Sequence, residues 1–252
     1  MDVNYYLADP TGNITALVMS RPGINVERVA QKIMESEKSV EQVGFVDFSD
    51  GISLRMSGDE FCGNATMSAA ALYYSLSGKS GEYETHVSVY GTGDPVGVRV
   101  KGEKNYFDCE CSVSGPDEIR EAEFKACGSS YRFPLVCFKG IMHIVADETL
   151  SEEAAKSVIK ELAENLGAKA LGIMLLEDGK RRMSPIVYVS KTGTLFRENS
   201  CASGSCAVAA VTGKKGEKIA LLQPGGTLYV MNSDRIYLSG RVRLSKCFSK
   251  EI

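Results

Sequence analysis

The sequence predicts an α/β protein, in the α+β arrangement, made of two similar domains. The first observation is that Cys62, in FCGNATMSAAALYY, and Cys201, in SCASGSCAVAAV, each open a small-residue helix directly after a strand. The second is that the surrounding elements repeat in one order: helix, paired strands, cysteine-headed helix, paired strands. We therefore expect two pseudo-symmetric domains, residues 1–114 and 115–238, each a curved, mostly antiparallel sheet around its cysteine helix.

The first half starts its repeat with a helix after Asn25. Apolar residues recur there at helical spacing from Val26 to Met34. Apolar runs predict two strands before the Cys62 helix and two after it, beyond a glycine-containing turn. In chain order these strands are VGFVDF, ISLRM, VGVRV and YFDCEC.

The second half repeats this order. Thr149 followed by Glu152 has the spacing of a capping box, which predicts a helix start there, and Gly167 is placed to end that helix. Two strands again precede the cysteine helix and two follow it. In chain order they are LGIMLLED, PIVYVS, TLYVMN and RIYLSG.

The composition is that of an ordinary globular protein. The chain of 252 residues has 44% hydrophobic and 24% charged residues, enough for two domains with a core each. A net charge of −3 gives no reason to expect nucleic acid or an anionic membrane surface as a partner. No apolar run approaches the ~20 residues of a membrane span, and the start MDVNYYLADPTGN does not resemble a signal peptide. We expect a cytoplasmic protein.

The cysteine spacing argues against a metal site or a disulfide framework. Eight cysteines in a chain of this kind are expected to be reduced, and the absence of C-x-x-C argues against a zinc site. Only His86 and His143 are available to join a metal site. Five cysteines in apolar or strand-like contexts are interpreted as structural: Cys109, Cys111, Cys127, Cys137 and Cys247.

The two helix-opening cysteines suggest acid–base chemistry. A helix N-terminus carries about half a positive charge and several unpaired N–H groups, which favours a thiolate and binds carboxylates. Two such ends facing one cleft would hold a substrate carboxylate and place a sulfur on each side of its α-carbon. This arrangement suits inversion at that carbon. The alternative is that both are closely packed small-residue helices in which cysteine serves only as a small side chain.

Several blocks of the sequence resemble a known family. FCGN and SCASGSCA resemble the two cysteine motifs of the diaminopimelate epimerase superfamily, whose members use no cofactor, and Asp9–Asn13 resembles its first loop. EQVGF, MSGDEFCGNATMS, ENSCASG and QPGG are similar to the histidine racemases that supply D-histidine for opine-type metallophores. The resemblance covers essentially the whole chain. It implies a diaminopimelate epimerase-like fold in which a last strand, near residues 239–252, returns to the first domain.

The resemblance also implies a set of site residues. Cys62 and Cys201 match the two acid/base thiols, which act without cofactor or metal. His143 corresponds to a histidine close to the first cysteine, and Glu198 to a glutamate near the second, although its spacing is shorter than in diaminopimelate epimerases. The partner implied is a small-molecule substrate, an amino acid, and a homodimer is compatible with this assignment. The substrate-binding residues expected are Asn13, Glu41, Gln42, Gly63, Asn64, His143, Glu198, Ala202, Ser203 and Gly204.

Departures from the diaminopimelate epimerase pattern suggest the substrate. The asparagine and arginine with which that family holds a distal amino-acid group are missing, since RMSGDEFC lacks the first and Asn199 takes the place of the second. A neutral imidazole needs one hydrogen-bond acceptor instead, which Glu41, Asp59 or Glu60 can supply. The expected activity is therefore the interconversion of L- and D-histidine.

Other functions remain open at this stage. The chain can be a diaminopimelate epimerase or a racemase of another amino acid on the same fold. A phenazine-biosynthesis type of isomerase shares the fold but lacks the cysteine pair, and a thiol redox protein would be expected to carry C-x-x-C. A non-catalytic amino-acid-binding protein is the remaining alternative.

Overall fold

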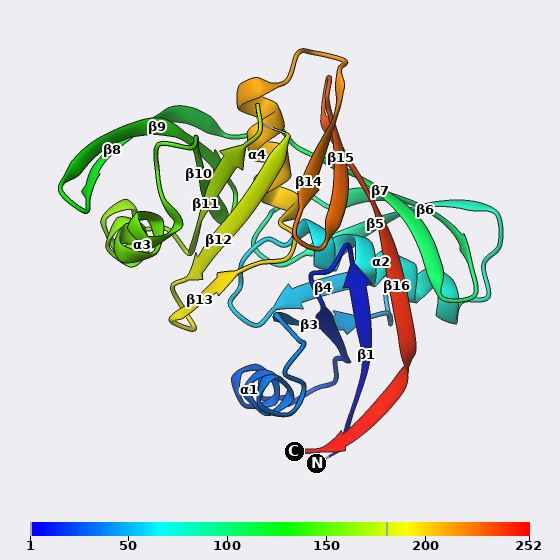
Figure 1. Cartoon of the computed structure of the whole chain (residues 1–252). Coiled ribbons are helices and arrows are strands. Elements are labelled where there is room, and N and C mark those ends of the chain that lie inside the picture. The colour runs from blue at the N-terminus through cyan, green and yellow to red at the C-terminus, as the bar shows by residue number, and fades with distance from the viewer. Residues whose placement is uncertain (1, 180) are drawn as a thin grey trace.

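The computed structural model describes residues 2–179 and 181–252 and shows two halves, each built around one helix (Figure 1). Among these residues the helices are α1 (Val26–Ser36), α2 (Gly63–Leu76), α3 (Glu152–Leu166) and α4 (Ala202–Thr212). The strands are β1 (Asp2–Pro10), β2 (Thr15–Met19), β3 (Gln42–Asp47), β4 (Ile52–Met56), β5 (Glu82–Val89), β6 (Val96–Glu103), β7 (Tyr106–Val113), β8 (Glu118–Ala126), β9 (Ser129–Phe138), β10 (Ile141–Ala146), β11 (Ala170–Glu177), β12 (Arg182–Val189), β13 (Thr194–Arg197), β14 (Lys218–Gln223), β15 (Gly226–Asn232) and β16 (Ile236–Glu251).

The first half is a closed barrel around α2. Strands β1 to β7 follow one another in the sheet, β16 pairs with β7, and β16 also pairs with β1, which closes the ring. Helix α2 is buried on nearly all sides because its residues are small or apolar, as in Ala69, Ala70 and Ala71. Helix α1 lies outside the barrel against β3 (Figure 1).

The second half is an open sheet around α4. Its order runs from β16 through β15, β14, β12, β11, β10 and β9 to β8, with β13 paired to β12. Helix α4 packs against β15 and β10, and α3 covers β11 and β12 from the other face. Strand β8, which is the free edge, carries alternating charges such as Arg120 and Glu121, which discourage pairing with another chain.

The strand pairings confirm the repeat that the sequence predicted. In the first half β2 and β3 are parallel and joined through α1, while β4 and β5 are parallel and joined through α2. In the second half β10 and β11 are parallel through α3, and β12 and β14 through α4. The remaining pairs of the described residues are antiparallel, so each sheet is mostly antiparallel as expected. The fold class is the predicted one.

Two local expectations were wrong. Helix α3 is capped by Ser151, whose hydroxyl accepts from the Ala154 N–H, whereas the Thr149 hydroxyl donates to Asp147 in the preceding turn. The capping box expected at Thr149 is therefore not formed. RIYLSG and the last strand are not separate, since β16 runs without interruption from residue 236 to 251 and joins both sheets.

The other helix ends agree with the sequence. Asn25 caps α1 by accepting from the Arg28 N–H at 2.9 Å, and Gly167 ends α3 in the left-handed conformation that glycine adopts readily. Within the described residues, none of the helices has the length and apolar character needed to cross a membrane.

Candidate active site

The N-termini of α2 and α4 meet at the junction of the two halves. Cys62 is the N-cap of α2, and Cys201 is the N-cap of α4. The first residues of the two helices are in contact, because a Cβ added to Gly63 would lie 2.9 Å from the Ala202 Cβ. Asn64 crosses the junction and donates to the Ser200 carbonyl at 3.0 Å. The structure therefore brings together the two helix ends that the sequence singled out.

Gln42 links the first thiol to the second half of the chain. The Cys62 thiol donates to Gln42 Oε1 at 2.9 Å, and Gln42 Nε2 donates to Glu198 Oε1 at 2.8 Å. Cys62 Sγ also accepts from the Ala65 N–H at 3.4 Å. Gln42 and Glu198 are 156 residues apart in the sequence. Folding therefore brings Cys62, Gln42 and Glu198 together in one hydrogen-bonded network.

The second thiol has its own set of partners. The Cys201 N–H donates to Gln223 Oε1 at 2.7 Å, and Gln223 Nε2 donates to Ser205 at 3.0 Å. Cys201 Sγ lies 3.7 Å from Ser203 Oγ, which is 2.9 Å from His143 Nε2. Sequence reasoning missed the role of Gln223, although the QPGG motif that contains it was noticed.

His143 is hydrogen-bonded on the Cys201 side of the site. The resemblance implied a histidine close to the first cysteine, and the hydrogen bond that His143 makes is with Ser203, beside Cys201. Burial lowers the pKa of His143 to about 3, so its ring is neutral near pH 7. A neutral ring can accept or donate at Ser203, but it brings no positive charge to the Cys201 thiol.

The thiol pKa values contradict the expectation from the helix ends alone. Burial raises the pKa of Cys62, and the Glu198 and Glu60 charges raise it further, while the Ala65 and Asn64 N–H groups lower it only in part. Burial likewise raises the pKa of Cys201 well above its ordinary value, and the Glu198 charge adds to this effect. Both thiols are therefore protonated when they are enclosed, and a base is needed to make a thiolate.

Glu198 is the carboxyl whose charge acts on both thiols. It is buried, which excludes the interpretation of this residue as a solvated loop acid. Burial raises the pKa of its carboxyl to about 8, although hydrogen bonds with Cys201 and Gln42 lower it in part. A carboxyl that gains and loses its proton close to neutral pH is suited to exchanging protons with a thiol.

Glu41 and Asn13 form a second set of hydrogen bonds next to this network, through Asn199, which follows Glu198 in the sequence. Asn13 Nδ2 donates to Glu41 Oε2 at 2.9 Å, and the Asn199 side chain donates to the other oxygen of the same carboxylate. The Asn199 N–H donates to Glu41 Oε2 as well, at 3.3 Å. Burial raises the pKa of Glu41. Glu41 therefore fixes the loop before Cys201 to the loop that contains Asn13.

A cavity of about 500 Å³ leads to this site from the surface. It lies between α1 and the β12–β13 hairpin, which face each other across the two halves (Figure 1). Val187, Val189 and Phe196 form an apolar wall, and Gln42 and Glu198 line its floor. Because these two floor residues bind the thiols directly, Cys62 and Cys201 lie one hydrogen bond behind the cavity.

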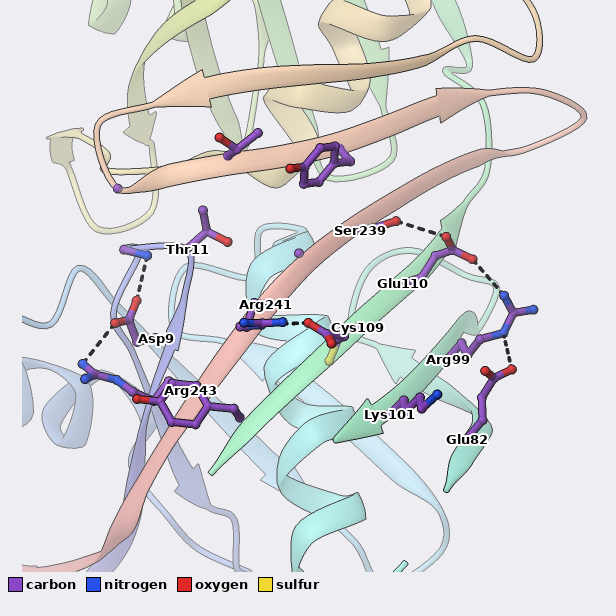
Figure 2. A pocket seen from close by; sticks show the side chains of 17 residues that line it. Asp9, Thr11, Glu82, Arg99, Lys101, Cys109, Glu110, Ser239, Arg241 and Arg243 are labelled. Carbon is purple, nitrogen blue, oxygen red and sulfur yellow. Dashed lines mark hydrogen bonds and ion pairs between the residues drawn. The ribbon is translucent and has the colours of Figure 1, made fainter. Parts of the chain in front are cut away.

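A larger concavity of about 850 Å³ lies elsewhere and does not reach the thiols. Figure 2 shows it running over β16, β7 and β6, with the β14–β15 hairpin above. Its charged side chains bind one another, as in Arg241 with Asp108 at 2.8 Å and Arg243 with Asp9 at 3.2 Å. Because its charges neutralise each other at a wide, open surface, we assign the chemistry to the smaller cavity.

The described residues contain no group of three or more histidine, cysteine, aspartate or glutamate side chains placed to hold a metal ion. The acids around the thiols are instead bound by amide groups. Gln42, Asn13 and Asn199 supply these amides.

Comparison with known proteins identifies similar sequences along the whole chain. A family model described as the histidine racemase CntK N-terminal domain matches residues 2–245. A histidine racemase of Fusobacterium nucleatum is 30% identical over 256 aligned positions, which cover 96% of this chain and 94% of the relative. A histidine racemase of Staphylococcus aureus is 25% identical over 237 positions, with 88% and 85% covered.

Solved structures share the fold at low sequence identity. A predicted epimerase from Pseudomonas aeruginosa has a TM-score of 0.72 at 17% identity and covers 99% of each chain. A hydroxyproline epimerase from Agrobacterium vitis, with bound trans-4-hydroxy-L-proline, has a TM-score of 0.66 at 13% identity and covers 99% of this chain and 91% of that one. A PhzF-family phenazine biosynthesis protein from Bacillus anthracis has a TM-score of 0.65 at 16% identity and full coverage. These similarities establish the fold.

Proposed function

The chain belongs to the histidine racemase family, and from that premise we propose that it interconverts L- and D-histidine with Cys62 and Cys201 as its two acid/base groups. It is an amino-acid racemase, and so an isomerase. The observation that carries the proposed mechanism is the meeting of two cysteine-capped helix ends beside one buried glutamate, Glu198.

The helix ends supply the binding site for the substrate carboxylate. The first N–H groups of a helix have no partner within it and point outward along the axis, where the helix dipole is positive. Gly63 and Asn64 begin α2, while Ala202, Ser203 and Gly204 begin α4. A carboxylate between them places its α-carbon between the two sulfurs. The same N–H groups stabilise the negative charge that spreads onto the carboxylate as the α-proton leaves.

Proton transfer begins at Cys201 for one enantiomer. Glu198, as a carboxylate, takes the thiol proton of Cys201 and leaves a thiolate. The thiolate removes the α-proton, and the Cys62 thiol gives its own proton to the opposite face of the carbon. The product has the inverted configuration, Cys62 is then a thiolate, and Cys201 is a thiol. Reaction of the other enantiomer runs the same steps from Cys62.

The lining of the cavity supports histidine over diaminopimelate. Two lysines face it, and no arginine is present among its lining residues. Five glutamates also face it, so the distal carboxylate of diaminopimelate would meet more carboxyl groups than cationic partners. An imidazole ring instead offers an N–H group to these acids and an apolar face to the wall. The acidic residues of the cavity are Glu27, Glu35, Glu41, Glu60 and Glu198.

Exchange of the α-proton in heavy water tests this proposal. The protein is incubated with L-histidine and the α-proton signal and the optical configuration are followed together. We expect loss of the proton signal and formation of D-histidine, with slower reaction of diaminopimelate and of other amino acids. Faster reaction of diaminopimelate would contradict the substrate assignment, and histidine binding without exchange would show a binding protein instead.

A further inference from the structure

We propose that Glu60 is the residue that recognises the substrate ring, by accepting an imidazole N–H at its Oε2 atom, an inference that rests on the proposed histidine racemase activity. Three acids near the site were open to this role from the sequence: Glu41, Asp59 and Glu60. The structure distinguishes them by the partners that each one already has.

Glu60 has a buried oxygen without a partner. Its residue is only 6% exposed, it lines the cavity of about 500 Å³, and Oε2 has no hydrogen bond to any described residue. A buried carboxylate oxygen without a donor costs free energy, so a native site is expected to supply one. Because Glu60 lines the cavity, a substrate N–H is the donor that we assign to this oxygen.

The other acids are already occupied. Asp59 is bound by Arg55 Nε at 2.7 Å and by Lys191 Nζ at 2.9 Å. Glu41 accepts from Asn13 on one oxygen and from Asn199 on both. Glu198 accepts from Gln42 and is held beside Cys201. The Glu60 carboxyl accepts from the backbone N–H groups of Gly58 and Glu60, yet among the three acids open to this role from the sequence it is the one with a buried oxygen, Oε2, that has no partner.

The space around Glu60 suits a flat ring. A Cβ added to Gly58 would lie 2.5 Å from Glu60 Oε2 and 2.5 Å from Val189 Cγ1, so the glycine leaves room for the carboxylate beside the valine. Val187 and Phe196 continue this apolar wall. A ring lying on the wall would have its edge toward Glu60, which combines apolar contact with one directed hydrogen bond.

Glu60 is also close to the reacting groups. It stands two residues before Cys62, and its charge is near enough to raise the pKa of both Cys62 and Glu198. A side chain bound at Glu60 therefore belongs to a substrate whose α-carbon is at the thiols. Glu60 acts as a specificity residue, because it contacts the ring and takes no part in proton transfer.

The test compares histidine with its ring-methylated forms. Neutral Nτ-methylhistidine and Nπ-methylhistidine have no ring N–H, so the unmodified protein should use both with a kcat/KM at least about tenfold lower than that for histidine. In Glu60→Met, which removes the acceptor but keeps the volume, the KM for histidine should rise by about tenfold to a hundredfold. Glu60→Gln, which keeps a neutral acceptor, should give a smaller increase.

The decisive measurement is whether the variant loses the preference for histidine over its ring-methylated forms. In Glu60→Met, histidine and the better methylated form should be used about equally, whereas a purely structural role of Glu60 would slow both and preserve the preference. Glu161→Gln is the matched control, since Glu161 is exposed on α3, does not line this cavity, and its replacement should change neither the KM for histidine nor the preference for histidine over its methylated forms.

Each failure has a distinct meaning. Preference for histidine that persists in a folded Glu60→Met variant would overturn the assignment of Glu60. Equal use of histidine and both methylated forms by the unmodified protein would overturn it without any variant, so the test does not depend on variant folding. An unmodified protein that does not racemise histidine at all would instead overturn the proposed function.

Discussion

Cys62 and Cys201 cap their helices, yet the pKa of each thiol is raised because burial outweighs the nearby N–H groups. Each buried sulfur would lose far more hydration as an anion than as a thiol. Glu198, with a pKa near 8, is therefore essential to the charge balance of the site. At the residue scale the resting state is two thiols and one titratable carboxyl, and their protons are shared.

Removal of either sulfur should stop racemisation. Cys62→Ala and Cys201→Ala each delete one of two acid/base groups, so we expect a loss of activity of about a thousandfold in each variant with little change in folding. Cys206→Ala is the control, because Cys206 is buried further along α4, where its electrostatic neighbour is Cys111. The measurements are optical rotation with L-histidine and circular dichroism. Full activity in Cys62→Ala would refute the two-thiol mechanism.

Glu198 should give the protein a characteristic pH dependence of stability. Its pKa is about 8 in the folded protein against an ordinary value of 4.5, so between these values the folded state keeps a proton that the unfolded state has lost. The free energy of unfolding should therefore fall as pH rises through this window, by up to about 1.4 kcal/mol per pH unit from this group.

The variant Glu198→Gln isolates this contribution. It removes the titration while keeping the shape, so its stability relative to the unmodified protein should increase from about pH 5 to about pH 8 and then level off. Denaturant unfolding of both proteins at several pH values measures the difference, in which other titrating groups such as His143 cancel. A difference that is constant with pH would show that Glu198 ionises normally.

At the scale of elements, α2 and α4 are placed by small residues at their N-termini. Gly63 leaves space for Ala202, and both helices are surrounded by strands over most of their length. An amphipathic helix would not suit such a position, since it requires one polar face in water. The small residues by which the two cysteine helices were identified in the sequence thus also allow the N-termini of these helices to come into contact.

Gly63→Ala should separate the two helix ends. The new methyl group would lie 2.9 Å from the Ala202 methyl and 3.4 Å from Leu238 Cδ2, so a helix must shift. Overpacking of this kind costs about 1–3 kcal/mol, and displaced thiols should lower kcat more than they raise KM. Gly115→Ala is the control, because a Cβ at Gly115 has nothing within 4 Å. Unchanged kcat in Gly63→Ala would show that the spacing of the helix ends is not critical.

The sequence predicted elements better than contacts. Strand ISLRM was placed at its observed bounds, and the cysteine helices and the repeated order of elements were found, because the spacing of apolar residues and runs of small residues are local signals. The cap of α3 was assigned to Thr149 although Ser151 forms it, since two hydroxyls in one turn compete and only the backbone geometry decides between them.

Local sequence patterns could not predict the contacts between the two halves. The bonds from Gln42 to Glu198 and from Gln223 to Cys201 join distant segments, and the raised thiol pKa follows from the enclosure that these segments create. The resemblance to a family named most of these residues as site residues. It did not indicate which atoms they bind.

At the scale of the whole molecule, the site is divided between two halves that meet at the cavity. Lys191, from the second half, binds Asp59 Oδ2 at 2.9 Å and Glu27 Oε1 at 3.6 Å, both in the first half. Both thiols are buried behind Gln42 and Glu198, so a substrate in the cavity reaches them only after these two side chains move. The ion pairs of Lys191 favour the closed arrangement that excludes water.

Lys191→Met should weaken closure without damaging the fold. Partly exposed ion pairs contribute up to about 1 kcal/mol and are screened by salt, so the KM of the unmodified protein should rise several-fold at high ionic strength. The variant should have a higher KM that depends little on salt. Lys156→Met is the control, since Lys156 pairs with Glu152 within α3. The same salt dependence in Lys191→Met would indicate that other charges control closure.

The position of β16 has a consequence for synthesis of the protein. The first barrel is closed by residues 236–251, which pair with both β1 and β7, although every other strand of that barrel lies within residues 2–113. During synthesis, the sheet of the first half therefore stays unclosed, with β1 and β7 as unpaired edges, while more than a hundred later residues are translated. During that interval its β1 and β7 edges are unpaired, so it is the stage of synthesis at which we expect pairing with another chain to compete with closure of the barrel.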